Sequence, residues 1–243
     1  MGLINWVKNI GSNTLYFPGC LTKGVLKEEF ENYKKIFNKL GVEYILLSDE
    51  EVCCSLPVLN AGYKKDARKL MEKNFEIFKK YKVKKIITNC PSCYHAFKEI
   101  YPKIARDWNI DVEHTSITIL NAIKKKGIKV KTKENVSYHD PCHLGRYSGI
   151  YNEPRRVIEL LGGKIIEMKY NRENALCCGG GGGVRANFPE VAKAIAEKRI
   201  EGIPESTTKL ISPCGLCYLN LKTASDKSEE FSSFVLRKLE EGK

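Results

Sequence analysis

The sequence predicts an α/β protein built from two similar units, each with a short parallel sheet. The first observation behind this prediction is a duplication, because the ten cysteines form two groups of five with almost the same spacing. The second is that short apolar stretches alternate with amphipathic helical stretches in both halves. Strand alternating with helix indicates parallel strands joined by right-handed crossovers.

Three strands and two long helices are expected in the first half, followed by a helix that opens at its Cys-x-x-Cys pair. Apolar residues recur at helical spacing between residues 27 and 40, and Gly41 follows as a stop signal. The expected strands are 14–17, 42–47 and 85–88, and the expected helices are 27–40 and 67–81.

The same order of elements is expected in the second half. Its strands are 136–138, 164–168 and 209–211, and its helices are 153–161, 189–200 and 216–224. The basic stretch 124–134 is the expected linker. We therefore predict two pseudo-symmetric Rossmann-like units, residues 1–128 and 129–243, with metal clusters at the carboxyl ends of the strands.

Every cysteine belongs to one of the two groups, and all fall at strand ends or in the turns that follow. Ligands gather beyond the carboxyl ends of parallel strands, so we expect each group to surround one site. Cys142 lies 122 positions after Cys20, and the other four lie 124 positions after their counterparts. The first group is Cys20, Cys53, Cys54, Cys90 and Cys93, and the second is Cys142, Cys177, Cys178, Cys214 and Cys217.

Composition places the chain among globular proteins. It has 243 residues, of which 42% are hydrophobic and 29% charged. No stretch approaches the roughly 20 apolar residues of a membrane span, and the first residues lack the pattern of a secretory signal. We expect a cytoplasmic protein without a transmembrane segment, which would associate with a membrane only through a partner.

The formal net charge of +12 does not by itself indicate nucleic acid. Lysines cluster in runs such as 79–85 and 124–126, which are typical of solvated helix ends, with a docking patch for an acidic partner as the alternative. No recognition motif accompanies the charge, and basic residues do not alternate with aromatic ones. Nucleic acid is therefore not an expected partner.

Five thiols per unit favour an iron–sulfur cluster over zinc. Cytosolic thiols stay reduced, so metal binding or redox chemistry explains them better than disulfides. Structural zinc takes four ligands, often in two Cys-x-x-Cys pairs about 15–20 residues apart, whereas the two pairs here lie in different halves. Adjacent cysteines suit a cluster in which each sulfur binds a different iron. Four ligands with one neighbouring thiol remain an alternative, as do zinc and unliganded redox thiols.

These motifs resemble a known family. The segments Tyr138-His-Asp-Pro-Cys-His-Leu-Gly-Arg146 and Asn171-Arg-Glu-Asn-Ala-Leu-Cys-Cys-Gly-Gly-Gly-Gly-Gly-Val184 are similar to the duplicated CCG cysteine-rich domain. That domain occurs in heterodisulfide reductase catalytic subunits and in iron–sulfur subunits of anaerobic glycerol-3-phosphate, glycolate and lactate dehydrogenases. The resemblance implies two [4Fe–4S] clusters of a non-cubane type, each held by five cysteines, facing each other with a substrate disulfide between them.

The chain departs from this family pattern in two ways. Ser55 stands where the first CCG motif would have its glycine. No ferredoxin-type cysteine run is present, so the resemblance implies that electrons arrive from a separate iron–sulfur subunit or flavoprotein.

Residues beside the cysteines complete the candidate site. Gly179, Gly180 and Gly181 are expected to bring backbone amides close to a cluster, since the glycine run lacks the Lys-Ser/Thr of a phosphate-binding loop. His139 and His143 flank Cys142 and are candidate catalytic proton donors to a departing thiolate. The alternative for both is a hydrogen bond to backbone or cluster sulfur.

Two functions from different classes fit these residues best. The first is an oxidoreductase subunit that reduces or forms a small-molecule disulfide. The second is an electron-transfer subunit that carries electrons for a flavin-linked dehydrogenase. A structural zinc protein is the third hypothesis.

Overall fold

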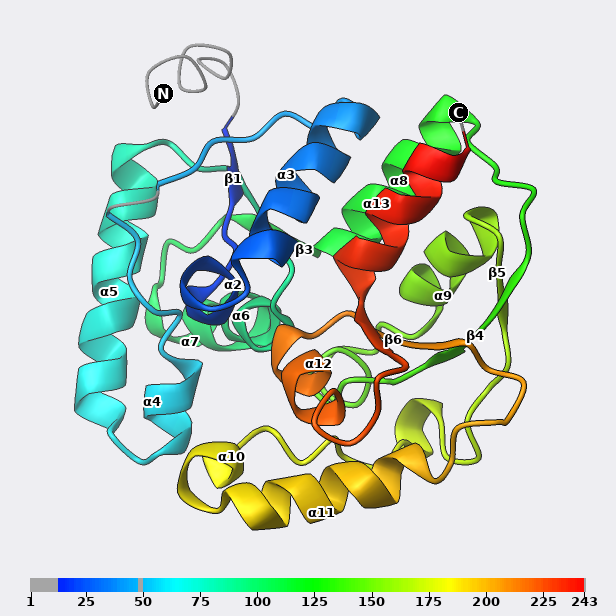
Figure 1. Ribbon diagram of the computed structural model, residues 1–243. Coiled ribbons are helices and arrows are strands. Elements are labelled where there is room, and N and C mark those ends of the chain that lie inside the picture. Colours follow the sequence, from blue (N-terminus) through cyan, green and yellow to red (C-terminus); the bar gives the residue numbers. More distant parts are fainter. Residues whose placement is uncertain (1–12, 48–49, 243) are drawn as a thin grey trace.

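Two parallel β-sheets flanked by helices form the molecule (Figure 1). The computed structural model describes residues 13–47 and 50–242. The first sheet has the strand order β1-β2-β3 and the second the order β5-β4-β6-β7, with every neighbouring pair parallel. The predicted α/β class with two short parallel sheets is therefore confirmed.

The first half supplies the first sheet and its helices. In chain order its elements are β1 (Thr14–Tyr16), α2 (Cys20–Gly24), α3 (Lys27–Leu40), α4 (Leu56–Asn60), α5 (Lys64–Lys80), β2 (Lys85–Thr88), α6 (Pro91–His95), the π-helical turn η1 (Ala96–Ile100), α7 (Tyr101–Ile104), β3 (Asp111–His114) and α8 (Thr115–Lys126). Helix α3 ends as predicted, with Gly41 in the left-handed region at φ 71°.

The second half follows a similar order, without a counterpart of α2 and with a full strand, β5, where the first half has one bridge. Its elements are β4 (Glu134–Tyr138), α9 (Asn152–Leu160), β5 (Gly163–Ile165), the 3₁₀ turn η2 (Arg172–Asn174), α10 (Val184–Asn187), α11 (Pro189–Ile200), β6 (Lys209–Ser212), α12 (Gly215–Leu221), β7 (Ser228–Glu230) and α13 (Phe231–Glu241).

Three expectations about elements were wrong. The strand expected over 42–47 is reduced to one parallel bridge between Ile45 and Leu15, because this segment pairs with the edge of β1 at that point alone. Each half also ends with a strand–helix pair that the sequence did not indicate, β3–α8 and β7–α13. The run 124–126 belongs to the last turn of α8 and not to the linker, in keeping with the preference of helix C-termini for cations.

The two halves pack through pairs of helices that a pseudo-two-fold axis exchanges. Helix α3 packs against α13, and α8 packs against α9. Because α3 and α9 both follow the first strand of their halves, and α8 and α13 are both last, each contact is the counterpart of the other. Figure 1 shows the first of these pairs, α3 and α13, side by side between the two sheets.

The largest apolar core is shared across this interface. It joins Tyr33 and Phe37 of α3 to Phe234 and Val235 of α13, all fully buried. A second cluster is built mainly by the first half, and a third, smaller one lies wholly in the second. The halves therefore share one core, and each half also has a smaller apolar cluster that is mainly or wholly its own. The boundary between residues 128 and 129 stays a prediction.

Glu230 is a buried acid at the start of α13 within this shared core. Its carboxylate accepts hydrogen bonds from the Ser232 amide at 2.6 Å and from the Tyr33 hydroxyl at 3.0 Å. Burial raises the pKa of Glu230 from 4.5 to about 7. Between these two pH values the folded state holds a proton that the unfolded state has lost, so this group's contribution to stability falls as pH rises.

Replacing Glu230→Gln should remove that pH dependence. We expect the wild type to lose up to about 3 kcal/mol of unfolding free energy between pH 4.5 and 7 through this group, and the variant to be flatter over the same range. Urea unfolding at half-unit pH steps measures the difference, with Glu229→Gln as the control at the neighbouring position. An unchanged slope in Glu230→Gln would show that Glu230 ionises normally.

Candidate metal centres

The first cysteine group is assembled by the turns after β1 and β2 and by the segment before α4. Cys20 opens α2, while Cys90 and Cys93 lie at the start of α6. Gly19, at φ 77°, lets the first turn pass against the second, because a side-chain carbon there would lie 3.2 Å from Cys93 Sγ. The sequence therefore folds two strand ends onto each other at this point.

Hydrogen bonds between side chains connect all five thiols of the first group. They run from Cys20 to Cys53, then to Cys54, Cys93 and Cys90. Hydrogen bonds from Cys53 and Cys93 lower the pKa of Cys54 to about 5. The thiols are thus close enough to share negative charge, which metal binding requires.

The second group has the same plan. Its hydrogen bonds connect Cys177 to Cys178, then to Cys217 and Cys214. Cys142 lies in the turn after β4. Burial raises the pKa of its thiol, and so does the negative charge of the nearby Cys214 and Cys178. All ten cysteines are free thiols, and the structure brings them together in the two groups of five expected from the spacing.

Each group extends from the interior to the surface. Its buried members occupy matching positions, Cys54 and Cys93 in the first group and Cys178 and Cys217 in the second. Each group also has one exposed thiol, Cys20 in the first and Cys177 in the second. Neither group is sealed from solvent.

Backbone amides after the adjacent cysteines point at sulfur in both copies. Ser55 N donates to Cys53 Sγ at 3.4 Å, and Gly179 N donates to Cys177 Sγ at 3.3 Å. Gly180 N donates to Cys178 Sγ at 3.4 Å, and a side-chain carbon at Gly180 would lie 3.0 Å from Leu216 O. Amide donors of this kind stabilise metal-bound thiolates. Gly181, in contrast, is exposed with no atom within 4 Å of its Cβ position.

Ser55 and Gly179 occupy the same left-handed position with different residues. Ser55 has φ 69° and a buried hydroxyl without a hydrogen-bond partner, whereas Gly179 has φ 84°. Ser55→Gly should therefore stabilise the chain by about 1 kcal/mol, since a non-glycine residue in this region costs about 1–2 kcal/mol. Gly179→Ser should destabilise it by more than that, because the new side-chain carbon would meet Ala192 O at 2.8 Å. Thermal unfolding of both variants measures the effects, and equal effects would contradict this account.

The two candidate histidines lie beside different thiols. His139 is buried, and one of its ring nitrogens lies within 4.8 Å of the sulfurs of Cys178 and Cys217. His143 is half-buried with Nδ1 3.5 Å from Cys142 Sγ, and burial lowers its pKa. Both therefore belong to the second group.

Both cysteine groups lie along the interface between the halves. Helix α2, which Cys20 opens, packs against α12 of the second half, where a side-chain carbon at Gly215 would lie 2.4 Å from Leu26. Elsewhere in the interface, the ring of His95 lies 5.8 Å from that of His143. These residues closely follow Cys93 and Cys142. Figure 1 shows α2, α6 and α12 gathered where the two halves meet.

A buried ion network supports the turn that carries Cys142. Arg155 donates two hydrogen bonds to Asp140, at 2.7 and 2.9 Å, and two to Glu167, at 2.7 and 3.0 Å. Asp140 also accepts from the backbone amide of Arg172 at 2.8 Å. The sequence indicated only a cap or turn role for Asp140. Its buried arginine partner, on another element, gives no local signal.

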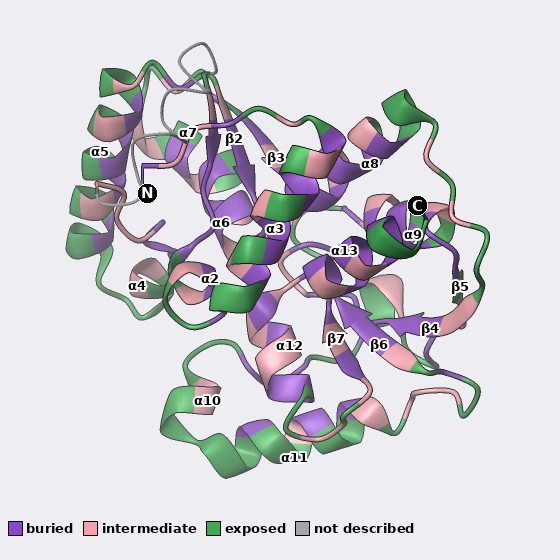
Figure 2. Cartoon of the chain, turned by 45° about the horizontal axis from the view of Figure 1, so that its top comes forward, coloured by how far each residue is buried: buried purple, intermediate pink, exposed green. Residues whose placement is uncertain are grey.

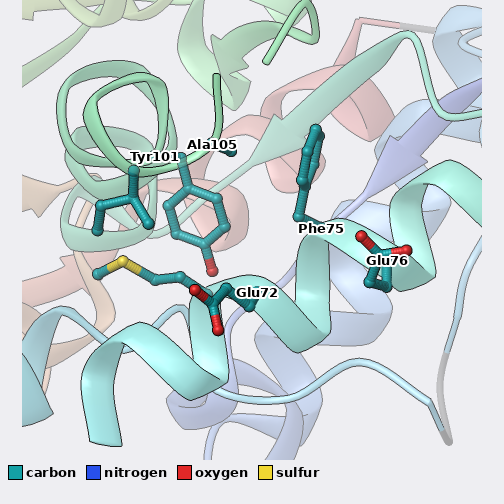
Figure 3. A pocket seen from close by; sticks show the side chains of 7 residues that line it. Glu72, Phe75, Glu76, Tyr101 and Ala105 are labelled. Carbon is teal, nitrogen blue, oxygen red and sulfur yellow. The ribbon is translucent and has the colours of Figure 1, made fainter. Parts of the chain in front are cut away.

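A small cavity of about 80 Å³ lies between α5 and α7 (Figure 3). Its lining includes Met71, Phe75 and Tyr101, and the Tyr101 hydroxyl shares a hydrogen bond with Asn74, which holds the backbone of Cys53. No thiol lines the cavity, so it is not part of the first cysteine group.

Comparison with known proteins identifies the family. The Cysteine-rich domain CCG matches residues 14–98 and 136–222, which together cover well over half of the chain. The chain therefore belongs to the CCG cysteine-rich family and contains its domain twice.

Several similar proteins carry the names of oxidoreductases or of their subunits. A dihydromethanophenazine:CoB–CoM heterodisulfide reductase subunit of Methanosarcina barkeri is 34% identical over 225 residues, covering 88% of this chain and 54% of the relative. A fumarate reductase (CoM/CoB) subunit of Methanothermobacter marburgensis is 30% identical, covering 90% and 44%. An EtfAB:quinone oxidoreductase of Syntrophomonas wolfei is 35% identical, covering 70% and 24%.

The chain thus spans little more than half the length of the methanogen heterodisulfide reductase relative, and less of the other two. Among solved structures, the aspartate racemase of Picrophilus torridus aligns with 95% of this chain over 94% of its own length. Its TM-score is 0.43 and its sequence identity 14%, so this similarity is too distant to bear on function. In the described part of the chain, no helix is both long and apolar enough to cross a membrane.

The thiols fit the cofactor that this family implies. Each group has soft sulfur donors, two of them buried, and backbone amides that donate hydrogen bonds to sulfur. These are the features that iron–sulfur sites use. The family and the donor set together support iron–sulfur clusters as the bound groups.

Proposed function

We propose that this chain is an iron–sulfur oxidoreductase subunit that reduces or forms a disulfide, such as a heterodisulfide, with two [4Fe–4S] clusters. Each five-cysteine group would hold one cluster, and five thiols per cluster favour the non-cubane form. The observation that carries the proposal is that two complete thiol groups lie along one interface and that each reaches the surface. The names of the methanogen relatives, which include CoM and CoB, support a thiol or disulfide substrate.

The reaction balances with two electrons. Cleavage of R–S–S–R′ consumes two electrons and two protons and releases RSH and R′SH. When bound, each cluster would exchange one electron at a time. The electrons would come from an iron–sulfur or flavoprotein partner, and the reverse reaction would return them.

The chain's own residues would hold the substrate and supply protons. His143 lies at the half-buried edge of the second group, which suits a proton donor to a departing thiolate. The segments after the two adjacent cysteine pairs, 55–57 and 179–183, would form opposite walls of the substrate site.

A second function, electron relay between a flavoprotein and another acceptor, is favoured by the relationship to an EtfAB:quinone oxidoreductase. A relay would use the same clusters but would need no disulfide site. The two functions therefore differ in what the isolated, reduced chain can do.

A single-turnover experiment separates them. The partner-free, cluster-loaded chain is reduced with dithionite, freed of excess reductant and mixed with CoB–CoM heterodisulfide or with hydroxyethyl disulfide. The proposal predicts two thiols released per chain, with one electron lost from each cluster. Clusters that stay reduced with both disulfides, but are oxidised by a soluble quinone, would overturn the proposal in favour of the relay.

A further inference from the structure

We propose that Arg199 is a positioning residue that makes His139 an N–H donor to the second cysteine group, so that the second cluster accepts an electron before the first. This inference rests on the proposed function to the extent that both groups hold clusters. It goes further by making the two sites unequal and by giving electron transfer an order.

Arg199 is a buried cation without a carboxylate partner. Only 1% of its surface is exposed. It lies on α11, which also buries Ala192 and Ala196 on the same face, while Figure 2 shows most of this helix as exposed. Across residues 13–47 and 50–242, no carboxylate forms an ion pair with Arg199, and the nearby Asp140 is paired with Arg155.

A buried charge without an opposite charge is strongly unfavourable, so other groups must compensate the charge of Arg199. Its guanidinium donates from Nε to His139 Nδ1 at 3.2 Å and from Nη1 to Tyr170 O at 2.8 Å. Nη2 is buried with no hydrogen-bond partner. The negative groups that face it are Asp140 and the sulfurs of Cys217 and Cys178. Because Asp140 is already paired with Arg155, the thiolates of the second group are the remaining negative charge that faces Arg199.

The hydrogen bond from Arg199 also fixes the proton on His139. A guanidinium N–H can only donate, so Nδ1 of His139 must accept, and the neutral ring carries its proton on Nε2. Since Nδ1 faces Arg199, Nε2 is the nitrogen left to face Cys178 and Cys217, and the ligand atoms of these three residues lie within 4.8 Å of one another. His139 is thereby a donor to sulfur and not a metal ligand, although its ring lies near the sulfurs of Cys178 and Cys217.

The duplication provides an internal comparison, because the first group has no counterpart of the Arg199–His139 pair. Phe17 stands three residues before Cys20, as His139 stands three before Cys142. Its ring packs edge-on against Phe97 at 4.9 Å and Phe78 at 6.4 Å. The counterpart of α11 is α5, whose buried residues include no cation: Ala67, Met71, Asn74, Phe75 and Phe78.

The two environments favour different charge states. Adding an electron makes a cluster more negative, and hydrogen-bond donors and a nearby cation stabilise that state. At the matching position of the first group, Phe17 and its aromatic neighbours offer neither this donor nor a cation. The second site should therefore have the higher reduction potential and receive the first electron.

A redox titration of the cluster-loaded chain, followed by EPR, tests this inference. The wild type should show two separate steps. His139→Phe, which copies the first group, and Arg199→Met should each make the upper step at least tenfold less favourable, a fall of about 59 mV for one electron, and leave the lower step unchanged. Arg199→Lys, which keeps the charge and a donor, should recover most of the shift. Arg156→Met, which removes an exposed arginine, is the matched control and should move neither step.

The Cys54→Ala chain gives a second measurement that leaves the second site untouched. If it loses the first cluster, its remaining step should be the upper one. Unchanged potentials in His139→Phe with iron retained, or an upper step that belongs to the first group, would overturn the inference. A wild type with no cluster at the second group would instead contradict the proposed function.

Discussion

Replacing Cys178→Ala should remove the second cluster and leave the first in place, so that the chain loses about half of its iron and sulfide. Cys178 is the centre of the second group, because it is buried and hydrogen-bonded to Cys177, Cys217 and His139. The apolar cluster around it lies wholly in the second half. Loss of the second cluster should therefore not disturb the shared core or the first five thiols.

The matched variant is Cys54→Ala, at the corresponding position of the first group. In the wild type, Cys54 is buried and hydrogen-bonded to Cys53 and Cys93 in the same way. Each variant should retain the half of the iron that the other loses, as measured by metal and sulfide analysis of anaerobically purified protein. Complete loss of iron in either variant would mean that the ten cysteines form one shared site.

Replacing Arg155→Met should destabilise the chain by about 3–5 kcal/mol, the usual consequence of removing one partner of a buried ion pair. Arg155 is 4% exposed, and its guanidinium lies 4.5 Å from the ring centre of Tyr138. Without it, Asp140 would remain buried with one backbone hydrogen bond, from Arg172. Because Asp140 precedes Cys142 by two residues, the variant should also hold iron at the second group less firmly.

The neighbouring Arg156→Met serves as the control. Arg156 is exposed and pairs with Glu159 one turn away at 3.0 Å, a type of contact that contributes about 1 kcal/mol or less. Urea unfolding at pH 7 compares the two variants, and the double variant Asp140→Asn/Arg155→Met should recover part of the loss. Equal stability of Arg155→Met and Arg156→Met would show that the buried network does not support the fold.

Most of the architecture could be predicted because its signals are local or repeated. The cysteine spacing identified the two groups, and helical periodicity identified α3, α5 and α11 close to their observed bounds. The missed strands are short and polar: β3 reads Asp-Val-Glu-His and β7 reads Ser-Glu-Glu, so neither shows the apolar pattern of a buried strand. They are strands because β2 and β6 provide neighbours to pair with.

The charged residues around the site could not be predicted for a related reason. Arg155 and Arg199 lie on helices where an arginine is normally solvent-exposed, and their partners are residues of distant segments. Only the folded chain brings them to Asp140 and His139. The duplication shows, however, that His139 replaces an aromatic residue of the first copy, and this difference was visible in the sequence.

The most direct test of the whole account is the iron, sulfide and zinc content of the wild-type chain purified without oxygen. Two four-iron clusters predict about eight irons and about eight sulfides per chain, with no stoichiometric zinc. Two zinc ions per chain without sulfide would contradict the account, because the ten thiols would then form structural zinc sites.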